Sequence, residues 1–217
     1  MMFRFIKPPY IVKYFFSELV WSINENEKTL YLTFDDGPTP GVTEKVLDVL
    51  KEYNAKATFF CLGKNVKEHT GLYHKILNEG HSTGNHTHTH LNGWKNNNHD
   101  YLNDINDCTE YLQSGLFRPP YGRIKPSQIH LLKQQYKIVM WSVLSYDFAR
   151  SVSPEMCWSY VKENTHDGAV IVFHDSVKAK EKVLYALPKF LEHYSNLGYS
   201  FDKIEPEFFN QVFPQAQ

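Results

Sequence analysis

TLYLTFDDGP, residues 29–38, begins with six residues rich in β-branched and aromatic side chains and ends in two carboxylates and a Gly-Pro pair. The six residues predict a buried strand, because such side chains pack well on a pleated sheet. Gly-Pro is a turn signal, so Asp35 and Asp36 stand where the strand ends. Strand patterns of varying strength recur at 56–62, 81–85, 116–118, 137–143, 169–174 and 199–204.

Segments with helical periodicity separate these runs, at 41–54, 72–80, 101–115, 126–136, 153–165 and 182–198. In the last of them, Pro188 predicts a kink or a later helix start. Strands that alternate with helices imply parallel βαβ units, which either close into a barrel or open into a doubly wound sheet. No GxGxxG follows the first strand, which disfavours the dinucleotide-binding open sheet. We therefore predict a barrel-like α/β fold.

Composition sets further bounds. The 217 residues suit a single domain, and a net charge of −1 gives no electrostatic reason to expect nucleic acid or an anionic membrane as a partner. The three cysteines are odd in number and form no CxxC pair, which fits a reducing compartment. We expect a catalytic domain at 28–217, preceded by an N-terminal segment at 1–27 that either packs on the barrel or touches a membrane, with packing favoured.

The N-terminal segment is apolar and aromatic, but lysines and prolines interrupt it. It has no small-residue cleavage site, so we do not expect a signal peptide. No run of residues is long and apolar enough to predict a transmembrane segment. We therefore expect a cytoplasmic location, with association with the cell envelope left open.

Side chains that can act in catalysis or bind a metal follow the predicted strands at their carboxyl ends. They are Asp35 and Asp36 after the first strand, His86, His88 and His90 after the third, Arg118 and Tyr121 at the fourth, Asp147 after the fifth, and His174 and Asp175 at the sixth. In a parallel barrel these strand ends meet at one mouth, where such enzymes build their sites. Residues spread over much of the chain are thus expected to converge.

The run GNHTHTH, residues 84–90, spaces three histidines at every second position. In a strand all three would share a face, whereas in a helical turn only His86 and His90 would. Two histidines with a distant carboxylate from the Asp35–Asp36 pair match a divalent-metal site with open positions. We expect the turn, with His88 facing away. The remaining isolated histidines are expected to be core or surface residues.

The other motifs have structural readings as well. Adjacent carboxylates often cap a helix, and the RPPYG loop with Arg118 could be stiff packing and a surface ion pair. Beside a catalytic carboxylate, however, an arginine would hold that group ionised. Asp147 next to His174 would favour the imidazolium form. Together these pairs would supply a base and an acid.

TFDDGP, HTHTH, RPPYG, SYDF and VFHDS, in this order, resemble the five motifs of the polysaccharide deacetylase family of carbohydrate esterases. The resemblance covers roughly residues 28 to 205 and implies a distorted (β/α)7 barrel. The fourth motif departs from the family pattern, because Phe148 stands where tryptophan is usual. Leu144 also stands where many members carry a further acid. The change to Phe148 bears on rate and substrate fit rather than on metal chemistry.

The resemblance also implies a metal site, in which Asp36, His86 and His90 would hold a divalent ion. Zn²⁺ is the usual choice in the family, and Co²⁺ or another divalent ion stays open. Pro119, Phe148 and Val172 would line the substrate pocket.

The family's catalytic roles carry over to the matching positions. Asp35 would be the general base with Arg118 as its partner, and His174 the general acid tuned by Asp147. The backbone N–H of Tyr121 would help to stabilise the oxyanion.

The implied reaction removes N-linked acetyl groups from an acetamido sugar or glycan, giving acetate and a free amine. A nearby alternative is hydrolysis of another acyl-amide or of an O-acetyl ester. An iron oxygenase or a non-catalytic carbohydrate-binding protein is disfavoured. Every expected catalytic position is filled, and an oxygenase has no need of Asp35, Arg118 and His174. Oligomeric state is left open.

Overall fold

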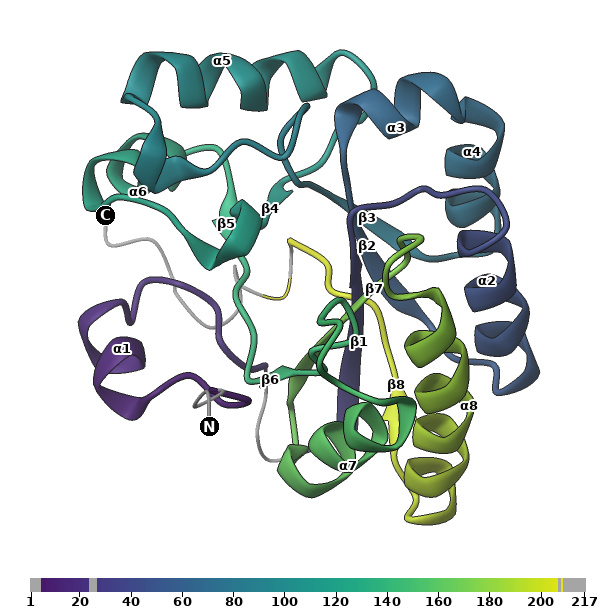
Figure 1. Cartoon of the computed structure of the whole chain (residues 1–217). Helices are drawn as coiled ribbons and strands as arrows, with labels where there is room; N and C mark the ends of the chain where they lie inside the picture. Colours follow the sequence, from purple (N-terminus) through teal and green to yellow (C-terminus); the bar gives the residue numbers. More distant parts are fainter. Residues whose placement is uncertain (1–4, 24–26, 207, 209–217) are drawn as a thin grey trace.

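The computed structural model of this chain describes residues 5–23, 27–206 and 208. Parts of the predicted segments 1–27 and 28–217, namely 1–4, 24–26, 207 and 209–217, lie outside the described residues. Within them, seven strands follow one another across the sheet in the order β5-β4-β3-β2-β1-β7-β6, and β8 pairs with β1 beside this path (Figure 1). Every strand pairing is parallel. This confirms the predicted barrel-like α/β fold.

The strands lie close to the predicted runs. They are β1 (Thr29–Asp35), β2 (Ala57–Cys61), β3 (Ser82–Asn85), β4 (Leu116–Phe117), β5 (Lys137–Ile138), β6 (Val143–Leu144), β7 (Val170–His174) and β8 (Ser200–Phe201). β1 lies inside the sheet between β2 and β7, and its side chains are almost entirely buried on both faces. Its Phe34 stacks between Phe59 of β2 and Phe173 of β7, with ring centroids 5.0 and 6.1 Å apart.

The helices pack outside the sheet. They are α1 (Tyr10–Phe15), α2 (Thr43–Glu52), α3 (Gly63–Glu68), α4 (Thr70–Asn78), α5 (Asn98–Thr109), α6 (Pro126–Leu132), α7 (Pro154–Asn164) and α8 (Lys180–Asn196), with 3-10 turns η1 (Gly93–Lys95) and η2 (Pro120–Gly122). All six predicted helices are present, and α1 and α3 are additional. Pro188 lies inside α8, so the helix starts before it. None of the described helices is long and apolar enough to cross a membrane.

The predicted strand at 137–143 is wrong as a single strand. Its start, β5, pairs with β4, whereas its end forms β6 and pairs with β7 at the opposite edge of the sheet. Between them, the carbonyls of Val139 and Met140 accept hydrogen bonds from the buried Arg118 side chain. The run therefore crosses from one edge of the sheet to the other and closes the barrel on this side.

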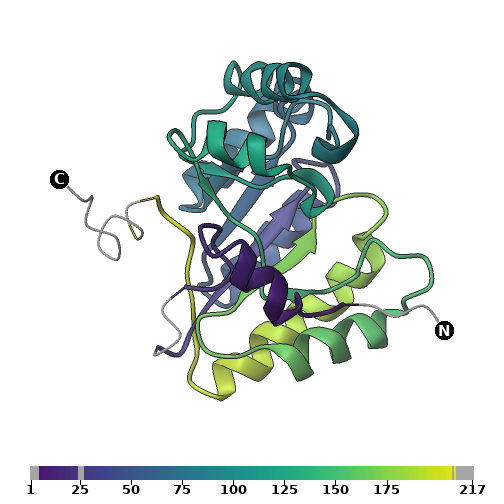
Figure 2. The ribbon, with the colours of Figure 1, turned by 90° about the vertical axis from the view of Figure 1, so that its left-hand side faces the viewer.

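The N-terminal segment completes this closure. Val20 forms a parallel bridge to Val139, and Ser22 an antiparallel bridge to Ala169. The side chains of Leu19 and Trp21 are buried there beside α6 and β5. In Figure 2 the segment faces the viewer, with α1 lying in front of the sheet. The part after α1 is thus packed on the barrel, whereas no residue of α1 itself is buried.

Candidate active site

A cleft of about 550 Å³ opens at the carboxyl ends of the strands. Nine of the predicted site residues line it: Asp35, Asp36, His86, His90, Pro119, Tyr121, Phe148, Val172 and His174. The remaining two, Arg118 and Asp147, are fully buried behind the wall, where they contact Asp35 and His174. The fold thus brings every predicted site residue to one place.

Asp36, His86 and His90 form a compact cluster on one side of the cleft. Asp36 Oδ1 lies 3.8 Å from His86 Nε2 and 3.3 Å from His90 Nε2, and one ligand atom from each residue lies within 4.8 Å of the others. Oδ1 is buried and accepts no hydrogen bond. Such an atom is costly unless another group satisfies it. A cation between the three side chains would do so, and the donor set suits a divalent metal.

His86 is prepared as a ligand. Its Nδ1 lies 2.7 Å from the carbonyl oxygen of Arg118, so Nδ1 carries the hydrogen and donates it. Burial lowers the pKa of His86 to about 3, with a further contribution from the nearby His90. The ring is therefore neutral, and its Nε2 lone pair points toward Asp36. Burial lowers the pKa of His90 as well, against the opposing charge of Asp36.

The backbone around Asp36 is held by the neighbouring helix α3. Asp36 has a positive φ of 80°, which aspartate tolerates better than most residues. Asn65 of α3 donates from Nδ2 to the Asp36 carbonyl at 2.7 Å, and Leu62 N–H donates to the Gly37 carbonyl at 3.0 Å. These contacts fix the turn that aims the Asp36 carboxylate at the two histidines.

The histidine run is a loop rather than the expected helical turn, because Thr87 and His90 both have positive φ of 66°. Asp104 of α5 holds it by accepting hydrogen bonds from His88 N–H and from Thr89 N–H and Oγ1. His88 points away from Asp36 and packs beside Tyr111, with ring centroids 5.6 Å apart. The expected division between inward His86 and His90 and outward His88 agrees with this geometry.

Asp35 and Arg118 form a buried ion pair behind the cleft floor. Arg118 Nη1 lies 2.7 Å from Asp35 Oδ1, and its other donors reach Thr33 and two backbone carbonyls. Its guanidinium also lies over the Phe60 ring at 4.1 Å. Burial lowers the pKa of Arg118, but the Asp35 carboxylate opposes that shift. Arg118 is thus a fixed cation that orients one oxygen of Asp35.

His174 and Asp147 form the second pair. The Asp147 carboxylate accepts two hydrogen bonds of 2.7 Å, one from His174 N–H and one from its Nδ1. Burial alone would lower the pKa of His174. The charge and hydrogen bond of Asp147, together with the charges of Asp36 and Asp35, outweigh burial and raise that pKa to about 9. Phe148 packs edge-on against the ring at 4.9 Å. His174 is thus an imidazolium that presents Nε2 to the cleft.

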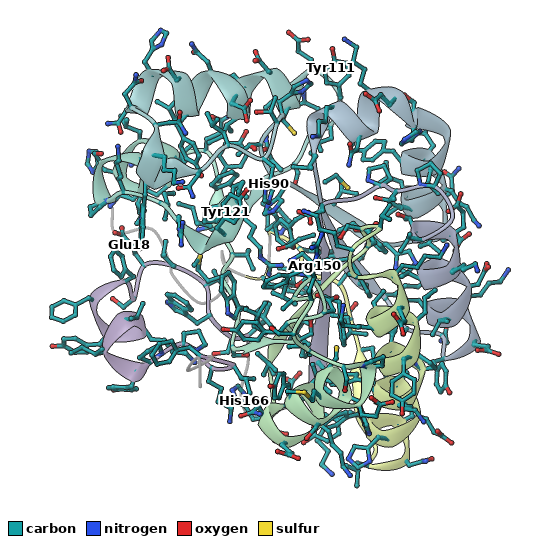
Figure 3. The ribbon with its side chains drawn as sticks, viewed as in Figure 1. Glu18, His90, Tyr111, Tyr121, Arg150 and His166 are labelled. Carbon is teal, nitrogen blue, oxygen red and sulfur yellow. The ribbon has the colours of Figure 1, made fainter. Side chains whose placement is uncertain are left out.

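Tyr121 in η2 supplies a backbone donor. It has a positive φ of 60°, and its N–H meets no backbone acceptor in the part of the chain that the structure describes. Its ring packs edge-on against His90 at a centroid distance of 4.5 Å, and Figure 3 shows the two side chains next to each other. The Tyr121 side chain therefore lies beside the cluster of Asp36, His86 and His90.

Sequence reasoning missed several groups that shape the cleft. Trp141 and Gly122 line one wall, and the exposed Lys64 and Lys178 line the rim. Asn65 and Asp104 hold the two loops from behind. Trp141 could have been found, since it lies in the 137–143 run where the chain reaches a strand end. The two lysines, Asn65 and Asp104 have no feature in the sequence that distinguishes them from ordinary surface residues.

One mouth of this parallel barrel holds a carboxylate–arginine pair, a carboxylate–imidazolium pair and an Asp-His-His cluster. Such a set of groups is typical of a barrel hydrolase. The family model described as "Polysaccharide deacetylase" matches residues 22–138. A peptidoglycan-N-acetylglucosamine deacetylase of Bacillus cereus is 35% identical over 191 residues, which covers 84% of this chain and 89% of that protein. This chain belongs to the polysaccharide deacetylase family.

Solved structures agree with this assignment. The Bc1960 peptidoglycan N-acetylglucosamine deacetylase, in complex with 4-naphthalen-1-yl-N-oxidanyl-benzamide, aligns with a TM-score of 0.84 at 32% identity, covering 96% of this chain and 98% of that one. BA3943, a CE4 family pseudoenzyme from Bacillus anthracis, aligns with a TM-score of 0.74 at 25% identity over 85% of this chain and 66% of that one. Activity therefore has to be argued from the site as well as from the family.

Proposed function

We propose that this protein hydrolyses the acetamide of N-acetylated sugars in a glycan, with peptidoglycan as the substrate class and a divalent metal, zinc by preference, as cofactor. The observation that carries the proposal is the presence of both ionic pairs on either side of the Asp36 cluster within one cleft. The peptidoglycan deacetylase similar to this chain supports the substrate class.

Asp36, His86 and His90 would hold the metal. The buried Asp36 Oδ1 without a hydrogen bond and the neutral His86 with its fixed tautomer fit such a group. When bound, a divalent metal polarises the acetamide carbonyl and lowers the pKa of water at the site. Because two of three ligands are imidazoles, the site favours zinc or a similar transition metal over magnesium or calcium.

Asp35 acts as the general base. Its Oδ1 is occupied by Arg118, so Oδ2 is the oxygen that we assign to taking the proton from the attacking water. The Tyr121 N–H stabilises the oxyanion that forms as the water adds to the carbonyl carbon. Removal of one such donor from an active site typically costs about 2.7–4 kcal/mol of transition-state stabilisation.

His174 acts as the general acid. Its proton passes to the sugar nitrogen as the C–N bond breaks, which releases acetate and leaves a free amine. Asp147 keeps His174 protonated until this step. Phe148 and Val172 form the apolar wall that receives the acetyl methyl.

The charge of the cleft rim favours an acidic glycan. Lys64 and Lys178 lie at the rim, and the lining residues that the structure describes include no acid besides Asp35 and Asp36. A glycan whose neighbouring groups carry carboxylates, as peptide-bearing peptidoglycan does, complements this charge better than a neutral chitooligosaccharide.

The test is acetate release from peptidoglycan fragments by the zinc-loaded protein and by Asp35→Asn, with metal content measured in parallel. The substitution removes the base and leaves the Asp36, His86 and His90 cluster in place, so we expect Asp35→Asn to keep its metal and to lose about a hundredfold or more in kcat. The free energy of unfolding should fall as well, because the buried Arg118 loses its charged partner. Asp48→Asn, on the exposed side of α2, is the matched control and should behave like the unaltered protein. Near-normal turnover by Asp35→Asn would remove the role of base from this residue.

A further inference from the structure

The segment before the barrel exposes large apolar side chains together. Five of them have exposed fractions of 62% or more. They are Phe5 and four residues of α1, namely Tyr10, Ile11, Tyr14 and Phe15. We call these five residues the aromatic patch. In Figure 3, aromatic rings project from α1 at the left edge of the molecule. Single exposed apolar residues are ordinary, but a contiguous group of them marks an interaction surface.

The residues that flank α1 fix the aromatic patch to the barrel. Phe16, directly after α1, packs against the cluster that contains Trp21, and Trp21 Nε1 donates to the Phe16 carbonyl at 2.9 Å. Before α1, the Ile6 carbonyl accepts a hydrogen bond from Leu144 N–H at 2.9 Å. The aromatic rings are therefore presented on an anchored element, although they contribute no buried surface to the fold.

Along the chain, the charged residues within the segment that bears the aromatic patch are all basic. Residues 5–17 include Lys7 and Lys13 and no acid. The next acid along the chain, Glu18, is paired with Lys133 at 3.0 Å. Aromatic rings interspersed with lysines are typical of segments at the membrane–water interface, where rings enter the headgroup layer and lysines meet anionic lipids. A second copy would instead place like charges opposite each other in a two-fold contact.

We propose that the aromatic patch docks this protein on the surface of a bilayer that contains anionic lipids. The patch is connected to the active site, since Leu144, whose N–H binds Ile6, lines the cleft. Docking would hold the cleft near a glycan that is assembled or anchored at a membrane. The proposal stands on the patch alone and does not depend on the deacetylase activity.

Co-sedimentation with vesicles of phosphatidylcholine, with and without phosphatidylglycerol, tests the proposal. We expect binding to the phosphatidylglycerol vesicles, weakened by added salt. Tyr10→Ser/Phe15→Ser should reduce the partition constant by about tenfold or more, because two rings lose their apolar burial. Lys7→Gln should weaken binding only where the vesicle is anionic. Leu131→Ser, an exposed apolar residue on α6, is the matched control and should bind normally.

Two measurements show whether each variant is folded: its circular dichroism spectrum and its turnover of a soluble acetylated oligosaccharide. We expect the spectrum and the turnover to be unchanged in every variant. Absence of vesicle binding by the unaltered protein would overturn the proposal. So would equal binding by Tyr10→Ser/Phe15→Ser. A concentration-dependent dimer in analytical ultracentrifugation that this double variant abolishes, without any vesicle binding, would assign the patch to self-association instead.

Discussion

His174 owes its protonation chiefly to Asp147, whose two carboxylate oxygens bind its ring and its backbone, with further contributions from the charges of Asp36 and Asp35. The pKa of His174 is raised to about 9, well above the ordinary 6.5. The stabilising contribution of this pair is therefore fully present below pH 6.5 and is lost as the pH rises through about 9. Catalysis that needs the protonated His174 should likewise be lost as the pH rises through this pKa.

Asp147→Asn should shift the alkaline limb of the kcat profile to lower pH. The substitution removes the charge that raises the pKa of His174, while the burial that lowers it stays. A bound dication would also lower this pKa, so both proteins are compared with the same metal. Measurement of kcat from pH 6 to 10 checks the shift. An unchanged alkaline limb would show that His174 is not the group that titrates there.

At the same scale, the sequence was sufficient to select the site residues but not their supports. His86 and His90 were selected as a pair of possible metal ligands that needs a distant carboxylate, and the family resemblance assigned that carboxylate to Asp36. Arg118 and Asp147 were selected with them, and both are buried against their expected partners. Asn65 and Asp104 could not be selected, because an amide or acid on a helix is ordinary until the loop it holds is seen.

At the scale of elements, η2 positions both the Tyr121 N–H and one wall of the cleft, because its backbone is in the left-handed conformation. Tyr121 and Gly122 both have positive φ, and a Cβ at Gly122 would overlap the Trp141 ring. Trp141 in turn lines the cleft. The turn thus couples the oxyanion donor to the substrate wall.

Gly122→Ala should therefore impair turnover more than folding. The left-handed backbone costs an alanine about 1–2 kcal/mol, and the added methyl must displace Trp141. We expect kcat/KM to fall by about tenfold or more. Gly71→Ala in α4, where a Cβ has no neighbour within 4 Å, should keep full activity and raise stability slightly. Kinetics and urea unfolding of both variants check this, and equal activity in the two would contradict the coupling.

Strand and helix positions were largely predictable, because apolar period and turn residues are local properties. The division of residues 137–143 into β5 and β6 was not. Their apolar pattern is continuous, whereas the division involves contacts of Val139 and Met140 with Arg118 and with Val20, which lie far away in the sequence. α3 was missed as well, since six residues of mixed polarity carry almost no period.

At the scale of the whole molecule, the barrel depends on a segment outside its repeating units. Val20 bridges to Val139 and Ser22 to Ala169, so the N-terminal segment links the crossing run to the residue that precedes β7. Trp21, 8% exposed, is the largest side chain that the segment buries there. Residues after α1 therefore support the fold, while α1 is left to make contacts elsewhere.

Trp21→Ala should lower the free energy of unfolding by about 3–5 kcal/mol, because it leaves a cavity beside α6 and β5. Trp94→Ala is the matched control, since that side chain is 60% exposed. Its loss should cost about 1 kcal/mol, chiefly the hydrogen bond to Ile124. Urea unfolding followed by circular dichroism compares them. Equal costs would mean that the segment does not stabilise the barrel.

The central claim for the molecule is that Asp36, His86 and His90 hold a metal which the deacetylase activity requires. Metal content and acetate release, measured together on the unaltered protein, His90→Ala and His88→Ala, test it most directly. We predict about one equivalent of zinc in the unaltered protein and in His88→Ala, with acetate release by both. His90→Ala should lose both metal and activity. Retention of metal and turnover by His90→Ala, or turnover that a chelator leaves unchanged, would contradict the account.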